Sequence, residues 1–283
     1  MKLRPGVPGD AGPCGRICYD AFAAIAAAHA YPCDFPSAEA ATGLVAALLG
    51  RPGIFSVVAE VGGEIVGSNF LDERTGIAGV GPITVAPAVQ DGAIGRHLMG
   101  AVLDRAAEQG AAGVRLVQTA YHTRSLALYA KLGFLAREPL ACLQGPPVDV
   151  TVGGRAVRPA GAADVEACNG LCRAVHGHDR APEVVDAVAG GSAVVVEHGG
   201  RITGYSTGLS FFAHSVGETD DDIRALIGAA PRFGGPGILV PIRNGPLFRW
   251  CLEQGLRVTQ LMTLMTTGLY NEPAGAWLPS IMY

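Results

Sequence analysis

Residues 80–98, which read VGPITVAPAVQDGAIGRHL, decide how the first part of the chain folds. The run from Gly79 to Val85 predicts a strand, Pro87 marks a turn, and a helix is expected over residues 95–109. Small residues at a helix start let backbone N–H groups point toward an anion, and the helix dipole adds positive potential. The pattern therefore predicts a pyrophosphate-binding loop, although it matches neither the Walker nor the Rossmann glycine spacing.

The residues that follow make the interpretation of this loop more specific. A strand is expected over residues 114–119 and a helix over residues 125–132, which Gly133 ends. Together the two stretches resemble the GCN5-related N-acetyltransferase (GNAT) family, and the resemblance covers nearly all of residues 1–145. The family's motif Gln/Arg-x-x-Gly-x-Gly/Ala falls on residues 90–95, with Ala93 where glycine is usual. Its signature Asn-x-x-Ala-x-x-Leu-Tyr-x-x-x-Gly-Phe falls on residues 122–134, with His122 and Ser125 replacing Asn and Ala.

The resemblance implies acetyl-CoA as the co-substrate, no metal, and direct acetyl transfer to the amine of a small molecule or peptide. It implies that the strand ending at Val85 pairs with the pantetheine arm and that Tyr129 is the general acid, since a phenol stays protonated at neutral pH. The residues implied to bind the cofactor are Ile83, Thr84, Val85, Gln90, Asp91, Gly92, Ala93, Ile94, Gly95, Arg96, Thr119, Ser125 and Tyr129.

The general base is less clear than the acid Tyr129. Asp72 and Glu73 end the strand before the loop, and His122 has an ordinary pKa near neutrality. The C-terminal carboxylate of Tyr283 and a water relay are further candidates. Charged residues at a strand end are more often simply solvated, so the base stays open.

An internal repeat predicts two related domains. The first copy contains Arg4, Pro5, Asp10, Cys14 and Cys18, which recur at one offset as Arg158, Pro159, Asp164, Cys168 and Cys172. Residues 57–67 likewise resemble residues 194–204, with a Gly-Gly hairpin turn in each. We therefore expect domains at 1–145 and 154–283, joined by a linker at 146–153. The expected fold class is α/β (α+β), with each domain a twisted mixed β-sheet flanked by helices. The cysteine pairs are interpreted as core residues rather than metal ligands.

The second copy lacks the chemistry of the first. Four acidic residues within 218–222 stand where a pyrophosphate would bind, and like charges would repel it. Asn244, Cys251 and Gly255 fall opposite His122, Tyr129 and Gly133. The second copy therefore resembles a degenerate domain that packs on the first and walls the acceptor pocket. The closing segment 268–279 is expected to cover a sheet edge.

Composition limits the remaining function classes. The 283 residues are 49% hydrophobic and 16% charged with a net charge of −4, which excludes a disordered chain and argues against a nucleic-acid-binding face. No secretory signal and no membrane-spanning run is evident, so we expect a cytoplasmic protein with reduced cysteines, as a monomer or homodimer. Two alternatives stay open: a non-catalytic acyl-CoA-binding or regulatory protein, and a mycothiol-synthase-like tandem enzyme whose C-terminal half is active.

Overall fold

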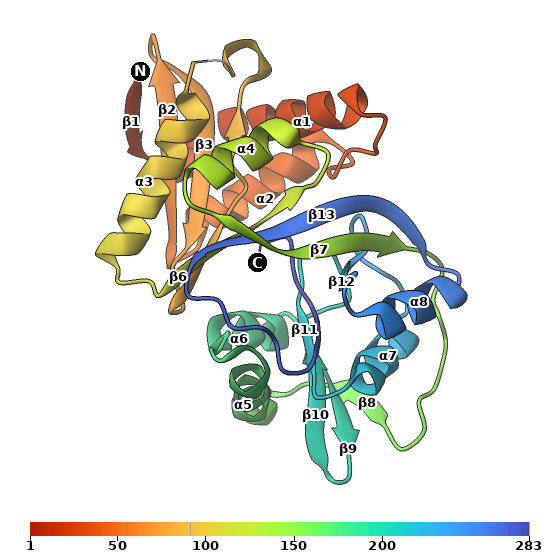
Figure 1. Ribbon diagram of the computed structural model, residues 1–283. Helices are drawn as coiled ribbons and strands as arrows, with labels where there is room; N and C mark the ends of the chain where they lie inside the picture. The colour runs from red at the N-terminus through yellow and green to blue at the C-terminus, as the bar shows by residue number, and fades with distance from the viewer. Residues whose placement is uncertain (91, 283) are drawn as a thin grey trace.

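The computed structural model describes residues 1–90 and 92–282 and has the predicted α/β architecture (Figure 1). The first half contains β1 (Lys2–Pro5), α1 (Ala11–Ala28), α2 (Ala38–Gly50), β2 (Ile54–Val61), β3 (Glu64–Asp72), β4 (Ile77–Val80), β5 (Thr84–Val85), α3 (Ile94–Glu108), β6 (Gly113–Thr119), α4 (Thr123–Lys131) and β7 (Leu135–Gln144). The second half contains β8 (Ala156–Pro159), α5 (Val165–His176), α6 (Ala181–Ala189), β9 (Val194–His198), β10 (Arg201–Ser206), β11 (Ser215–Gly217), α7 (Asp220–Ala229), β12 (Ile238–Pro241), α8 (Gly245–Glu253), β13 (Arg257–Gly268) and β14 (Ala276–Leu278). Short 3₁₀ turns lie at Pro8–Asp10, Pro87–Val89 and Ala162–Asp164.

The internal repeat is confirmed element by element. Every α-helix and strand from β1 to β7, apart from the two-residue β5, has a counterpart in the same order from β8 to β13. The repeated arginines even make the same ion pairs. Arg4 Nη1 lies 2.7 Å from Asp10 Oδ2, and Arg158 Nη1 lies 2.7 Å from Asp164 Oδ2. The two halves therefore share one fold, including details of local structure.

Both predicted hairpins turn at a glycine pair. Gly62 and Gly63 join β2 to β3 with φ angles of 62° and 88°, and Gly199 and Gly200 join β9 to β10 with φ angles of 59° and 78°. Two successive positive φ angles are the mark of a type I′ turn, which matches the twist of the flanking strands. The Gly-Gly pairs thus fix the register of each hairpin.

In the first half, helices cover both faces of the sheet. Helices α1 and α2 pack together on one face, where Cys14 and Cys18 are fully buried in a cluster with Val45 and Phe70. Helix α3 packs on the other face, against β2 and β3. The cysteines at i and i+4 are core residues, as the sequence indicated.

The second half repeats these layers. Helices α5 and α6 pack together, and Cys168 and Cys172 are buried between α5 and the strands, beside Val195. Helix α7 places Ile223 and Leu226 in a second core cluster. Strands β14, β11, β10, β9 and β8 form a five-stranded sheet in that order.

The two halves exchange their strands β7 and β13. The larger sheet has the order β1-β2-β3-β4-β6-β13-β7-β12, so β13 of the second half lies between β6 and β7 of the first. Met262 of β13 is opposite Thr119 of β6, and Val240 of β12 is opposite Ala141 of β7. Strand β6 of the first half thus pairs with β13 of the second half, and β12 of the second half pairs with β7 of the first. Figure 1 shows β7 and β13 side by side at the junction.

Glycines allow the close approach at both ends of this exchange. Gly268, at the end of β13, has a φ of +75°, and a Cβ there would lie 2.6 Å from the carbonyl oxygen of Ala112. Gly237, just before β12, has a φ of +136°, and a Cβ there would lie 2.0 Å from the carbonyl oxygen of Leu143. Only a residue without a side chain fits either place.

Two sequence expectations about the elements need correction. The single strand expected over residues 79–85 is two strands, because the chain bends at Gly81, whose φ is +139°. After the bend, β5 pairs with β3 instead of continuing beside β6. The sequence did not predict the helices α2 and α6. The Ala-rich sequence of α2 has little amphipathic periodicity, and α6 is short.

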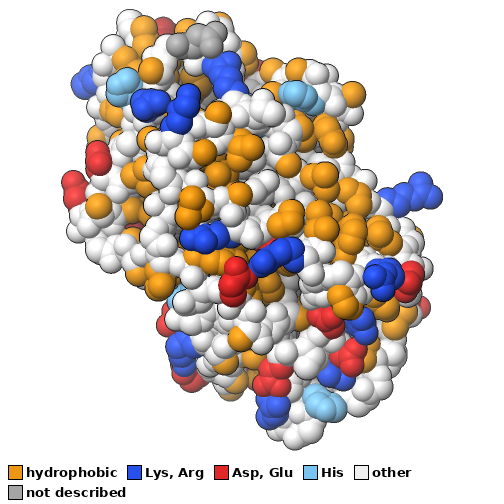
Figure 2. All heavy atoms as spheres, viewed as in Figure 1, with side chains coloured by type: hydrophobic (Ala, Val, Ile, Leu, Met, Phe, Trp, Pro, Cys, Tyr) orange, Lys and Arg blue, Asp and Glu red, His pale blue; other side chains and the backbone are white. Residues whose placement is uncertain are grey.

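The surface mixes both signs of charge with apolar side chains. On the face in Figure 2, hydrophobic side chains gather over the region of the shared strands. Leu135 of β7 and Val258 and Leu261 of β13 are among the exposed large apolar residues. Among the described residues, no helix combines the length and the apolar character that crossing a membrane requires.

Candidate active site

A cavity of about 610 Å³ opens where β4 and β6 separate. The parallel pairing of these strands runs from Ile77 opposite Gly113 to Gly79 opposite Arg115 and then stops. Beyond that point, residues 80–85 line one side of the cavity and residues 116–119 line the other. The splayed strands therefore leave a slot between them at the centre of the sheet.

The N-terminus of α3 opens on this cavity. Its N-cap residue, Ala93, has φ +59° and ψ +9°, which is the left-handed conformation that favours glycine. An alanine offers no side-chain acceptor, so the N-cap residue itself leaves the backbone N–H groups of the first turn uncapped. Ala93, Gly95 and Arg96 all line the cavity. The helix start is thus placed to bind an anion through backbone N–H groups and the helix dipole.

Most of the predicted cofactor-binding residues meet at the cavity. Those that line it are Ile83, Thr84, Val85, Gln90, Ala93, Gly95, Arg96, Thr119, Ser125 and Tyr129. Gly92 and Ile94 do not line it, and Ile94 instead packs in the core below α3. Asp91 lies outside the described residues. Gln90 also ties the loop to β5, since its Nε2 donates a hydrogen bond of 3.1 Å to the carbonyl oxygen of Val85.

Positive charge gathers at the α3 and α4 side of the cavity. Arg124 and Lys131 of α4 line the cavity together with Arg96 of α3. Of these three cations, the sequence predicted only Arg96. Three cations and one helix N-terminus form an electrostatic environment that attracts phosphate groups.

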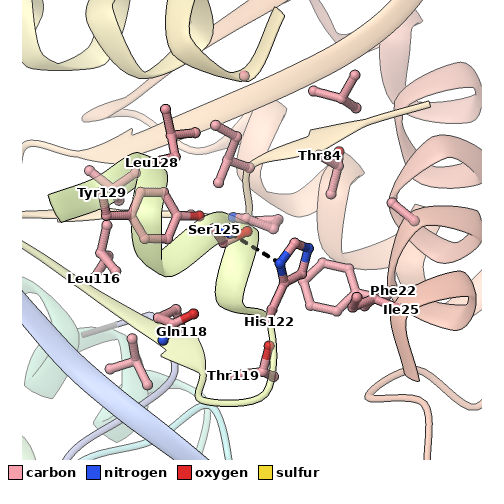
Figure 3. A pocket seen from close by; sticks show the side chains of 18 of the residues that line it. Phe22, Ile25, Thr84, Leu116, Gln118, Thr119, His122, Ser125, Leu128 and Tyr129 are labelled. Atoms are coloured by element: carbon pink, nitrogen blue, oxygen red, sulfur yellow. Dashed lines mark hydrogen bonds between the residues drawn. The ribbon is translucent and has the colours of Figure 1, made fainter. Parts of the chain in front are cut away.

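Tyr129 belongs both to the core and to the cavity wall. Its ring packs on Phe134, with ring centroids 6.2 Å apart, and the residue is only 6% exposed. Its hydroxyl points toward Ser125, one helical turn earlier (Figure 3). Burial raises the pKa of Tyr129 to about 12, against a smaller opposite effect of a hydrogen bond with Ser125. The phenol is therefore protonated at neutral pH and can donate a proton into the cavity.

His122 caps helix α4. Its Nδ1 accepts a hydrogen bond of 3.1 Å from the backbone N–H of Ser125, which is drawn as a dashed line in Figure 3. In the neutral ring, the proton is then on Nε2. Nδ1 is therefore the nitrogen that could take up a proton, and it already accepts a hydrogen bond from an N–H group. Burial also lowers the pKa of His122 below its ordinary value. This geometry favours a capping role for His122. It does not support the general-base role of His122, which stays a prediction.

Asp72 and Glu73 do not line the cavity. Both oxygens of Glu73 accept hydrogen bonds of 2.7 Å from Arg105 of α3, and Asp72 binds Arg74. Their carboxylates are held by arginines away from the slot. The expectation that either one is the general base therefore does not fit the structure. Tyr283, whose C-terminal carboxylate is another candidate beside a water relay, lies outside the described residues.

One carboxylate that the sequence did not predict meets the cavity from the opposite side. Asp34, in the loop between α1 and α2, lines the cavity and is 9% exposed. Its Oδ1 accepts a hydrogen bond of 2.9 Å from Gln260 Nε2 of β13. Burial raises the pKa of Asp34. The second half also contributes apolar side chains to the lining, namely Phe211, Phe212, Met262, Ile281 and Met282.

In the second half, a carboxylate of the protein lies at the corresponding helix start, that of α7. Thr219 is the N-cap of α7, and Asp222 accepts hydrogen bonds from the backbone N–H and the hydroxyl of Thr219, at 2.9 and 2.8 Å. Asp222 also pairs with Arg155 Nε at 2.9 Å and is 1% exposed. A buried carboxylate therefore lies at the start of α7, whereas at the start of α3 the N-cap residue Ala93 offers no side-chain acceptor.

The slot between the strands is also filled in the second half. Strand β14 pairs with β11, with Val216 opposite Trp277, and Ala276 and Leu278 share a core cluster with Ile238 and Val240 of β12. The closing segment thus covers the edge of β11, as expected from the sequence. It lies between two strands whose counterparts, β4 and β6, border the open cavity.

Comparisons with known proteins agree with this geometry. Residues 24–134 match the sequence profile described as the acetyltransferase (GNAT) family. No curated protein sequence matches the chain. Among solved structures, a protein of Pyrococcus horikoshii classed with the acetyltransferases is 16% identical, with a TM-score of 0.74 over 97% of this chain and 93% of that one.

Two further structures resemble the chain over nearly its whole length. A GCN5-related N-acetyltransferase from Sphaerobacter thermophilus is 16% identical, with a TM-score of 0.59 over 96% of each chain. A tandem GNAT protein from the clavulanic acid biosynthesis pathway is 15% identical, with a TM-score of 0.56 over 94% of this chain and 98% of that one. At these identities the likeness establishes the tandem fold. With the profile match, residues 24–134 belong to the acetyltransferase (GNAT) family, within a chain that has the tandem GNAT fold.

Proposed function

We propose that the protein is an acetyl-CoA-dependent N-acetyltransferase whose single active site lies in the first half. The observation that carries the proposal is that the start of α3, where Ala93 offers no side-chain cap, and the buried phenol of Tyr129 line one cavity between splayed strands. An anion site and a proton donor in one slot suit a phosphorylated thioester and its leaving group. The acceptor is the amine of a small molecule or peptide.

The residues of the slot fit coenzyme A. Gly95 and Arg96 at the start of α3 would hold the pyrophosphate, with Arg124 and Lys131 adding positive charge. Strand β5 pairs with β3 through one edge, which leaves its other edge to hydrogen-bond the pantetheine arm. Acetyl-CoA, when bound, supplies the activated acetyl group. A backbone N–H of β5 would polarise the thioester carbonyl.

Tyr129 would act when the carbon–sulfur bond breaks. Its phenol would donate a proton to the departing sulfur, so that CoA leaves as a neutral thiol. Because burial raises the pKa of Tyr129 to about 12, the donor form is present throughout the physiological range. His122 supports this arrangement indirectly, since its cap on Ser125 fixes the first turn of the helix that carries Tyr129.

The second half would act as a structural wall rather than a second catalytic site. Asp222 occupies its anion position and β14 occupies its slot. Both features disfavour the alternative in which the C-terminal half is the active one. Tyr129 in the open cavity favours an enzyme over a protein that only binds acyl-CoA.

Two measurements on the intact chain test this proposal. Isothermal titration with CoA should give one site per chain, and two equivalent sites would contradict the assignment of the second half. Free-thiol release from acetyl-CoA should then accelerate with one or more members of a panel of small amines and peptides. CoA binding without acetylation of any acceptor would favour the non-catalytic alternative.

A further inference from the structure

The side of the cavity away from α3 combines apolar walls with one buried carboxylate. Phe22 and Ile25 of α1 line it together with Phe35 of the following loop. Figure 3 shows Phe22 and Ile25 across from the start of α4. Phe211 and Met262 of the second half complete the wall. Of the described lining residues, Asp34 alone carries a carboxylate.

Contacts with both halves hold Asp34 in place. Gln260 of β13 donates a hydrogen bond of 2.9 Å to its Oδ1. Three residues earlier in the same loop, Tyr31 stacks on Tyr121 of the turn before α4, with ring centroids 4.3 Å apart and an angle of 8° between the rings. Gln260 is itself 1% exposed. The carboxylate is thus fixed between the two halves rather than carried on a free loop.

Among residues 1–90 and 92–282, this carboxylate has no cationic partner. None of the ion pairs recorded for the described residues includes Asp34, although it is only 9% exposed. The other buried acids differ, since Asp222 pairs with Arg155 and Glu138 pairs with Arg243. Burying an ionised carboxylate without a counter-ion is costly, so a cation that reaches Asp34 recovers part of that cost.

A second polar residue of the cavity also lacks a partner. Gln118 of β6 lines the cavity and is 6% exposed, and neither its Nε2 nor its Oε1 has a hydrogen-bond partner among the described residues. Buried amides in folded proteins are normally satisfied. The amide of Gln118 is therefore available to hydrogen-bond a polar group of a bound molecule.

We propose that Asp34 binds the ammonium group of the acceptor, and that the acceptor is a small primary amine with an apolar body held among Phe22, Phe35 and Met262. This inference rests on the proposed function and adds the class of acceptor to it. The charges divide the cavity in the required way. Arg96, Arg124 and Lys131 attract the phosphates at one side, and the single carboxylate attracts the cation at the other. Polyanionic acceptors and amines with a charged body do not match this lining.

The test compares an amine with its uncharged isostere on the CoA-saturated chain, where no turnover occurs. Isothermal titration with 2-phenylethylamine and with 2-phenylethanol should show at least about 10-fold tighter binding of the amine, the scale of a hydrogen bond to a charged group. In Asp34→Asn, which keeps the shape of the side chain, the two ligands should bind within about 2-fold of each other. Asp104→Asn, which removes an exposed carboxylate from α3, should keep the preference.

The outcomes separate this inference from the proposed function. Equal binding of amine and alcohol to the wild-type chain overturns the role of Asp34 without using any variant. A preference for the amine that persists in Asp34→Asn overturns it as well. CoA binding in the first titration depends on the other side of the cavity, so failure of that step would count against the proposed function. A stronger affinity for glycine than for 2-phenylethylamine would contradict the apolar body.

Discussion

Replacing Tyr129 by phenylalanine removes the phenolic oxygen from the cavity wall and leaves the ring. The ring is 6% exposed and packs against Phe134, so its apolar contacts persist. The variant lacks the hydrogen bond between the hydroxyl and Ser125, which lowers the free energy of unfolding by about 1 kcal/mol at most. The affinity for acetyl-CoA should change little, because the start of α3 and the edge of β5 are untouched.

Turnover of Tyr129→Phe should fall much more than binding. If the phenol protonates the leaving sulfur, losing it costs roughly 10²-fold in kcat, or about 2.7 kcal/mol of barrier. The assay is free-thiol release from acetyl-CoA with an accepted amine, corrected for thioester hydrolysis without amine. Tyr129→Phe working at the wild-type rate would refute the role of Tyr129 and return it to the core.

The pH dependence distinguishes Tyr129 from His122 as the acid. An acid must be protonated to act, so its contribution is full below its pKa and is lost as the pH rises through that value. For Tyr129 that loss is centred at a pKa of about 12, so no alkaline fall due to the acid is expected between pH 7 and 10. For His122, whose pKa burial lowers below its ordinary value, the loss would fall at acidic pH. A wild-type rate that falls as the pH rises through the acidic range to neutrality would therefore contradict the assignment.

Three further predictions concern the helix starts of the two halves. Ala93→Gly relieves the left-handed strain at φ +59° and should raise the free energy of unfolding by about 0.5–1 kcal/mol in urea titrations; a loss of stability would contradict the N-cap geometry. Gly95→Glu should abolish CoA binding in calorimetry, whereas Gly95→Ala should retain it, because a Cβ there makes ordinary contacts with Leu128 Cδ2 at 3.5 Å and Val85 Cγ2 at 4.0 Å. Asp222→Asn should lower the free energy of unfolding by about 2–3 kcal/mol without changing CoA affinity. The pKa of Asp222 is lowered in the folded chain, so this difference should be present at pH 7 and shrink as the pH falls below about 4.

The sequence predicted the parts of the fold that local patterns encode. The Gly-Gly hairpins, the repeated arginine and aspartate pairs and the α3 loop all depend on residues close in sequence or on one repeated motif. The substitution of His122 for Asn also has a local explanation. His122 caps α4 through Nδ1 just as Asn244 caps α8 through Oδ1, with acceptor distances of 3.1 and 3.2 Å. The two residues are interchangeable as N-caps because each offers one side-chain acceptor.

The strand exchange could not be predicted in the same way. Residues 135–144 and 257–268 both read as buried strands, and nothing in their periodicity states which neighbour each one pairs with. A repeat of two complete domains suggests that each copy closes its own sheet. The pairing of Met262 with Thr119 depends on contacts between residues more than a hundred positions apart. Asp34 was missed for a related reason, since its partner Gln260 lies on the other half of the chain.

The exchange also explains why a half without an open cofactor slot remains essential to the site. Strand β13 lies between β6 and β7, and from that position it brings Met262 to the cavity and Gln260 to Asp34. If the first half closed its own sheet, β7 would occupy this place, and its residues would face the acceptor instead. The first half therefore contributes the start of α3 and Tyr129 to the cavity, while the second half shapes the opposite wall. Acceptor preference can then change through substitutions in β13 that leave the α3 loop and Tyr129 untouched.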